Sequence, residues 1–325
     1  EGADVARALY RKLGRPFERH FESILRNNLI RICPVTPDDA KRALLIYGPD
    51  PATIKSKTTR SAPAPHVPTF KAITIPAPIL QHHRHVCICI DFFYVQGKPF
   101  FHTISRKIGF RTRTAVTNRT KPTIWTALVS VIRLMVIWTA LVSLIPDIHA
   151  DQEFECIRKT ILPIRLTTVP LNEHGPEIER TIRTVKERTR ATVHGLPFQR
   201  IPNILVDAII KSVVSNLNRF PREDDVSDTM SPLTIMTGRP NPDYNDLPLE
   251  LGEYVQVHEN NNPTNSMRAR TLGATALLPD DDRRTHRFIS LSTGQVIKRD
   301  HWTTMNMPQS AIERINALEI GRASV

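Results

Sequence analysis

Three acidic residues stand where an α/β protein could use them for chemistry. Asp91 interrupts the otherwise apolar segment 86–95, Asp151 ends a second β-like segment, and Glu179 lies at the start of a basic helix. An isolated buried carboxylate is costly, so Asp91 needs a partner, a metal ion or a catalytic role. Two acids on adjacent strands and one on a nearby helix can converge on a small volume.

The chemistry expected of such a group depends on cations. Three carboxylates in close contact repel one another and become protonated unless cations lie among them. Oxygen ligands suit Mg²⁺ or Mn²⁺. Two such ions about 3.5–4 Å apart can activate a water or a 3′-hydroxyl and stabilise the leaving oxygen of a phosphodiester. The sequence has no glycine-rich phosphate loop of the P-loop or Rossmann type and no Gly-x-Ser-x-Gly elbow.

The helix expected from about Pro176 carries two stripes. The stripe with core-facing spacing holds Ile178, Ile182, Val185 and Val193. The charged stripe beside it holds Glu179, Arg183, Lys186 and Arg190. One interpretation is an ordinary solvated face; the other is that the three cations follow a phosphate backbone. Glu177 competes with Glu179 as the third acid, although the phase against the apolar stripe favours Glu179.

The segments around these acids predict a mixed-sheet α/β domain. Three strands are expected over residues 86–95, 99–105 and 110–117. Helices and strands then alternate: a helix after Lys121, a β-like segment over 144–150, a short helix over 153–160, a strand over 164–169, the basic helix and a helix over 203–218. This order of elements is typical of an α/β fold.

The sequence predicts structural elements at both ends of the chain that are separate from the α/β domain. Residues 3–28 have helical spacing that Pro16 should split into two helices, and a short capped helix is expected over 39–46. The Pro- and Lys-rich run 52–80 predicts a linker. A terminal helix is expected over 310–318.

The net charge and the cysteine content indicate which partners and which redox compartment to expect. The net charge is +12 and the pI about 9.9. Residues 1–121 hold 21 Lys and Arg against 8 Asp and Glu, which favours contact with nucleic acid. The four cysteines suggest no disulfide framework and hence a reducing compartment. The His- and Cys-rich run 82–89 is not expected to bind zinc, because alternate residues of a strand lie about 6–7 Å apart and cannot converge on one ion.

A short duplication lies in the middle of the chain. Residues 124–130 recur as residues 137–143, and Arg133 is the single charge within 124–145. That length could span a bilayer, which would make the chain a membrane-anchored protein. The neighbouring segments look like strands of a soluble sheet, so a duplication inside a helix–strand unit is the favoured interpretation.

Several short motifs occur in the order found in one family. They are Asp151-Gln152-Glu153-Phe154, the run Glu173 to Arg180, Asn218-Arg219-Phe220-Pro221, the segment from Pro232 to Pro240, and weaker similarities at 9–14, 252–258 and 291–300. In this order they resemble the integrase of copia-type LTR retrotransposons. The resemblance covers nearly the whole chain.

The resemblance implies an RNase H-like five-stranded mixed sheet with flanking helices. It further implies a helical pre-integrase segment over 1–51, the linker 52–80, a catalytic core over 81–222, a connecting segment over 223–246 and a small β-rich domain with a terminal helix over 247–325. The implied activity is DNA integration, with end processing and strand transfer by two Mg²⁺ or Mn²⁺ ions held by Asp91, Asp151 and Glu179.

The implied partners are the DNA ends of the element, target DNA and further copies of the chain. The implied location is the nucleus, or a cytoplasmic particle before integration, and the chain would be cut from a polyprotein. Three departures from the family pattern leave a catalytically dead, nucleic-acid-binding remnant as the alternative. The amino-terminal zinc module is not recognisable, the two glycines after Asp151 are missing, and only 27 residues separate Asp151 from Glu179.

Overall fold

The computed structural model describes the chain in nine stretches: residues 2–56, 72–82, 85–138, 145–169, 176–221, 226–241, 248–259, 267–280 and 285–320. The chain forms two compact units. The terminal unit combines residues 1–67 with residues 249–318, and the core unit comprises residues 68–248 with the last seven residues, 319–325.

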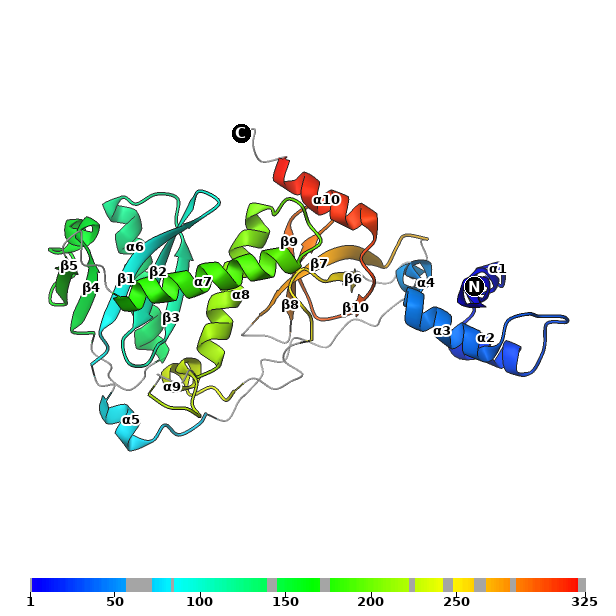
Figure 1. Ribbon diagram of the computed structural model, residues 1–325, viewed down its shortest axis with the longest axis horizontal. Helices are drawn as coiled ribbons and strands as arrows, with labels where there is room; N and C mark the ends of the chain where they lie inside the picture. The colour runs from blue at the N-terminus through cyan, green and yellow to red at the C-terminus, as the bar shows by residue number, and fades with distance from the viewer. Residues whose placement is uncertain are drawn as a thin grey trace. The chain divides into compact units, whose positions relative to one another are not determined.

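The core unit is built on one mixed sheet (Figure 1). Its antiparallel half consists of β1 (Ile88–Val95), β2 (Lys98–Ser105) and β3 (Arg111–Ala115). β4 (Asp147–Asp151) and β5 (Arg165–Val169) continue the sheet in parallel with β1, giving the order β3-β2-β1-β4-β5. The expected mixed sheet of five strands with flanking helices is therefore confirmed.

Helices cover both faces of this sheet. On one face, α6 (Lys121–Trp138) packs apolar side chains such as Ile124 and Leu128 against Ile88 and Ile90 of β1. On the other face, α7 (Pro176–Gly195) lies against β1 and β2 and contacts α8 (Asn203–Arg219), which packs on β3. The short elements of the unit are α5 (Ala77–His82), the 3₁₀ helix η1 (Gln152–Ile157) and α9 (Pro232–Thr237).

The duplicated segment falls partly on α6. Its first copy supplies buried residues to the sheet core, including Ala127 and Leu128. Residues 139–143 of the second copy lie outside the described residues. Within the described stretches, no helix has the length and apolar character needed to cross a bilayer.

The terminal unit contains a helical part and a second sheet. α1 (Gly2–Lys12), α2 (Glu18–Arg26) and α3 (Pro37–Tyr47) enclose a small core with Tyr10, Phe21 and Ala43. The break at Pro16 and the capped third helix agree with the sequence; Thr36 and Asp39 form the capping box. The sheet has the antiparallel order β10-β6-β7-β8-β9 and is followed by α10 (Gln309–Ile320). Its strands are β6 (Tyr254–His258), β7 (Thr271–Pro279), β8 (His286–Ser290), β9 (Val296–Arg299) and β10 (Trp302–Thr304).

Segments from the first and the last part of the sequence contact each other within this unit. The carbonyl of Lys55, at the end of α4 (Pro51–Ser56), accepts a hydrogen bond from the amide of Arg270 at 2.7 Å. The Asn306 side chain donates to the carbonyl of Ile46 at 3.2 Å. The start of the expected linker 52–80 is thus helical and partly packed, with Ile54 buried, because α4 lies against β7. Residues 57–71 lie outside the described residues.

Besides the helical start of the expected linker, one predicted helix differs in kind, whereas the other predicted helices and strands are confirmed within a few residues. The helix expected over 153–160 is the 3₁₀ helix η1, which begins directly after Asp151. Its short turns bury Phe154 and Ile157 against the sheet core. The cause is tertiary, since Phe154 stacks on Phe92 of β1 with 5.3 Å between ring centroids.

Candidate active site

The sheet register brings the first two acids together. β1 and β4 run parallel, with Cys89 opposite His149 and Ile90 opposite Ala150. Asp91 and Asp151 are the next residues on their strands, so their backbones are neighbours across about 4.8 Å. Both side chains are half-buried. Residues 92–150 lie between them in the sequence, so this proximity comes entirely from the strand pairing.

The alternation of side chains places both acids on one face. Ile90 and Ala150 belong to the core beneath α6. Asp91 and Asp151 therefore project to the opposite face, which α7 covers. The amide of Phe92 donates to Oδ1 of Asp91 at 2.6 Å and fixes one carboxylate oxygen close to the strand. Two carboxylates thus share the α7 side of the sheet.

The third expected acid lies on α7 itself. Ile178 is buried, whereas Glu177 and Glu179 on either side of it are exposed. The buried stripe contains Ile178, Thr181, Ile182, Val185 and Thr189. Glu179 therefore stands beside this stripe, as its spacing predicts, on the helix that lies against β1.

The three carboxylates are not assembled into one ligand group. Among the residues that the structure describes, no set of three or more His, Cys, Asp or Glu side chains could hold a metal ion. Asp91 and Asp151 alone supply the paired oxygen donors that fit Mg²⁺ or Mn²⁺. Glu173 and His174, which precede α7 in the sequence, lie outside the described residues.

Glu177 is engaged at the start of β1. Its Oε2 accepts from Nε of Arg106 at 2.8 Å and from Sγ of Cys89 at 3.8 Å. Burial raises the pKa of the Cys89 thiol to about 12, so this sulfur is a neutral donor. Sequence reasoning named Glu177 only as a competitor of Glu179, because Arg106 lies 71 residues away and no local pattern joins them.

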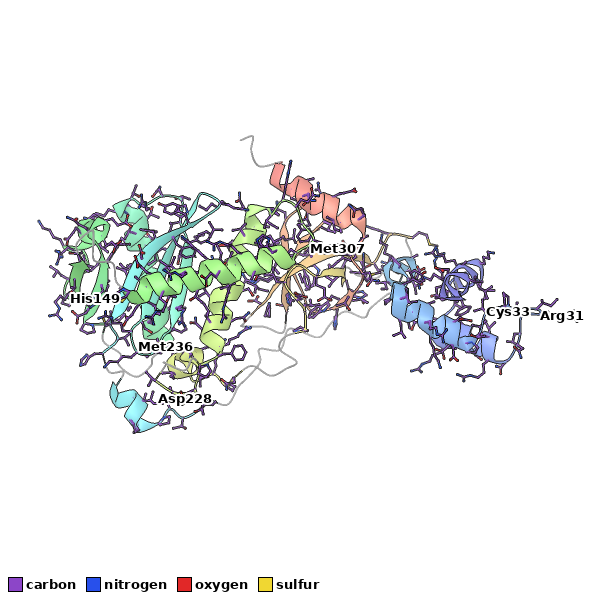
Figure 2. All side chains as sticks on the ribbon, in the orientation of Figure 1. Arg31, Cys33, His149, Asp228, Met236 and Met307 are labelled. Atoms are coloured by element: carbon purple, nitrogen blue, oxygen red, sulfur yellow. The ribbon has the colours of Figure 1, made fainter. Side chains whose placement is uncertain are left out.

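A histidine lies close to this contact. His149 of β4 is labelled in Figure 2, and its pKa is lowered mainly by burial and next by the positive charge of Arg106. The nearby carboxylates of Asp147 and Glu177 oppose that shift. His149 lies two residues before Asp151 on β4, so both side chains are on the same face of the strand.

A second carboxylate near Asp151 was missed by the sequence analysis as a site residue. Burial raises the pKa of Glu153, the nearby Arg119 opposes the shift, and Asp151 adds to it. Arg119 donates to Glu153 at 2.8 Å and also lies over the ring of Tyr94, 5.6 Å from its centroid. The signal available in the sequence was the spacing of Glu153, two residues after Asp151.

The expected DNA-binding residues form a row along α7. Arg183 and Arg190 are exposed and Lys186 is half-buried. They follow Glu179 at helical spacing, so all four side chains lie on the same side of the helix. The row can contact successive phosphates without reading bases.

Comparisons with known proteins give structural neighbours only. No protein family and no curated protein matches the sequence. One similar solved structure is the catalytic core domain of BIV integrase, with a TM-score of 0.34 and 14% identity over 46% of this chain and 92% of that domain. Another is the HTLV-2 integrase catalytic core domain in complex with magnesium, in a trimeric form, with a TM-score of 0.34 and 14% identity over 47% and 96%. Its dimeric form matches at 12% identity with the same TM-score.

Proposed function

We propose that this chain is a polynucleotidyl transferase of the integrase kind, which processes DNA ends and joins them to a target DNA. The observation that carries the proposal is the register of β1 and β4, which sets Asp91 beside Asp151 on the face that α7 covers. The oxygens of two neighbouring carboxylates suit hard divalent ions. The order of motifs along the chain supports the same function.

Asp91, Asp151 and Glu179 would hold Mg²⁺ or Mn²⁺. When bound, two such ions activate the attacking oxygen and stabilise the leaving oxygen of a phosphodiester. The chain's own residues orient this centre: the Phe92 amide fixes Asp91, and the burial of Ile178 sets the rotation of α7 that carries Glu179. Because Glu179 is not grouped with the two aspartates, the proposal includes an approach of the first turn of α7 when ions and DNA bind.

Arg183, Lys186 and Arg190 would hold the phosphate backbone along α7. The interaction is electrostatic, so binding should weaken steeply as salt rises. Several copies of the chain would associate around the DNA ends and act in the nucleus. The protein would comprise the five segments expected from the sequence.

The direct test is strand transfer by the purified chain on labelled DNA ends with Mg²⁺ or Mn²⁺. We expect the parent to join the ends, and Asp151→Asn to abolish joining while keeping salt-sensitive DNA binding. Equal joining by parent and variant would refute the site. DNA binding by a parent that joins no ends would favour the catalytically dead remnant, which the missing glycines after Asp151 already suggest.

A further inference from the structure

The first turn of α7 presents two glutamates in different directions. Residues on a helix advance by about 100° each, so Glu177 and Glu179 diverge by about 200° around its axis. Ile178 lies between them and is buried. The rotation of this turn therefore decides which carboxylate can approach Asp91 and Asp151.

Glu177 is held by contacts to β1 and to the residue after β2. The Nε atom of Arg106 donates to Oε2 of Glu177 at 2.8 Å. Arg106 is itself anchored, because its amide donates to the carbonyl of Cys87 at 2.8 Å. The same oxygen of Glu177 accepts from the thiol of Cys89. One carboxylate thus joins the start of α7 to the residues at the beginning of β1.

The helix side of the contact is also fixed. The hydroxyl of Thr181 donates to the carbonyl of Glu177 at 2.9 Å, and Thr181 is 2% exposed. Cys89 is buried and lies two residues before Asp91, on the same face of β1. Glu177 therefore covers the position directly next to the proposed site.

We propose that Arg106 and Glu177 form a latch that fixes the first turn of α7 on β1, so that Glu177 is a positioning residue and not a ligand of the proposed metal ions. This inference rests on the proposed function for the metal ions. The latch itself is a property of the fold and has a readout independent of activity, namely the protection of the Cys89 thiol.

The first measurement is the alkylation rate of Cys89 by iodoacetamide in a chain whose other three cysteines are serine. Arg106→Glu places two like charges together and also removes the guanidinium that lowers the pKa of Cys89, so the rate is compared per thiolate from its pH dependence, and we expect it to rise about fivefold or more. The exchanged pair Arg106→Glu with Glu177→Arg should return the rate to within about twofold of the parent. Glu179→Gln is the matched control on the same turn and should leave the rate unchanged.

The second measurement is strand transfer by the same variants. Glu179→Gln should lose activity, Glu177→Gln should lose about fivefold, and the exchanged pair should recover most of the loss of Arg106→Glu. Circular dichroism checks that each variant is folded. Loss of activity in Glu177→Gln as complete as in Glu179→Gln, with no recovery in the exchanged pair, would instead make Glu177 the third acid and overturn the inference.

The two proposals fail in different ways. A parent without strand transfer refutes the proposed function, and the Cys89 rates then still decide whether the latch exists. Unchanged Cys89 alkylation in folded Arg106→Glu, or no recovery of protection in the exchanged pair, refutes the latch whatever the activity.

Discussion

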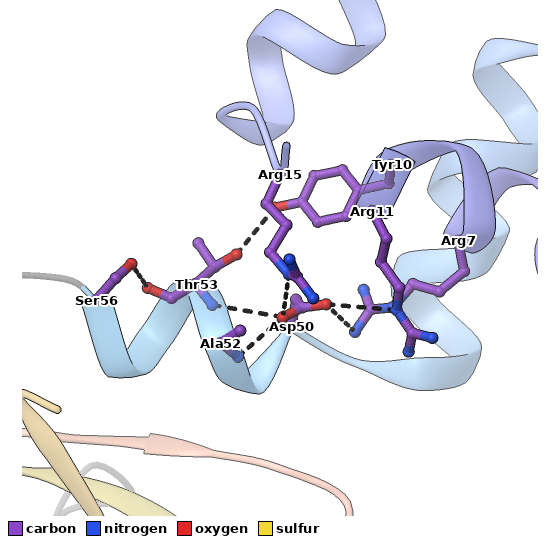
Figure 3. Close-up of polar contacts among 8 residues, drawn as sticks. All are labelled: Arg7, Tyr10, Arg11, Arg15, Asp50, Ala52, Thr53 and Ser56. Atoms are coloured by element: carbon purple, nitrogen blue, oxygen red, sulfur yellow. Dashed lines mark hydrogen bonds and ion pairs between the residues drawn. The ribbon is translucent and has the colours of Figure 1, made fainter. Parts of the chain in front are cut away.

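Asp50 in the terminal unit and Asp91 with Asp151 in the core unit show two ways of placing aspartates within a fold. Asp50 is almost fully buried, and three guanidinium groups surround it (Figure 3). The distances from its oxygens are 3.7 Å to Arg7, 3.9 Å to Arg11 and 3.4 Å to Arg15. Its Oδ1 also accepts from the amide of Ala52 at 2.9 Å, which caps α4.

Asp91 and Asp151 differ from Asp50 in the group that the fold places beside them. The register places each of them beside another carboxylate. At Asp50 the arginines neutralise the charge and tie α1 to α4, which is a structural task. In the core unit the paired carboxylate oxygens are the donors that the proposed divalent ions would need. The difference suggests that the charge environment of an acid indicates its role better than its burial does.

The largest expected effect is a loss of strand transfer, which should follow a change of Asp91 but not a change of Asp50. Asp91→Asn should lower strand transfer by about a thousandfold or more, because the lost ligand supplies several kcal/mol of stabilisation through the ions. Its free energy of unfolding should stay about equal, since asparagine keeps the side-chain oxygen that accepts from the Phe92 amide. Asp50→Asn is the control and should keep strand transfer within a few fold. Similar activity losses in both variants would erase the distinction.

The next effect concerns stability. Asp50→Ala removes the cap of α4 and the anion shared by three arginines, and should cost the terminal unit about 2–3 kcal/mol. The arginines are partly exposed and regain water, which limits the loss. Hydrogen exchange at amides of α1 and α4 measures it. Asp50→Asn retains a capping oxygen and should lose less; equal losses would mean that the charge alone matters.

A smaller effect comes from His102, a titratable residue that the core unit buries in its uncharged form. Burial lowers the pKa of His102 to about 3, and the charge of Arg111 adds to this shift. The unfolded chain binds a proton below about pH 6.5 that the folded chain does not, so acid favours unfolding. His102 should cost the fold about 1.4 kcal/mol per pH unit between pH 6.5 and 3, or about 2 kcal/mol at pH 5.

Denaturant unfolding of parent and His102→Phe at pH 7 and pH 5 checks this expectation. The parent should lose about 2 kcal/mol more than the variant on acidification. The same loss in both proteins would show that other groups dominate. A protonated His102 in the folded chain, seen by NMR at pH 5, would contradict its burial as a neutral group.

The sequence was sufficient to predict most helices and strands. It was not sufficient to predict which distant residues they contact. Apolar periodicity predicted the strand around Asp91 and the helix after Pro176, because side-chain spacing along one segment is a local property. The form of η1 was not predictable, since it depends on Phe154 reaching Phe92 across the sheet. The helical start of the segment 52–80 depends in the same way on α4 meeting β7.

For the candidate site, the sequence by itself determined which acids exist and that Glu179 lies beside the apolar stripe of its helix. Only the tertiary structure decided that Asp91 and Asp151 are neighbours and that Glu177 is held by Arg106. The physical reason is that strand register and contacts between distant segments depend on the path of the whole chain. Local patterns fix the direction of a side chain relative to its own element, and packing fixes what that side chain meets.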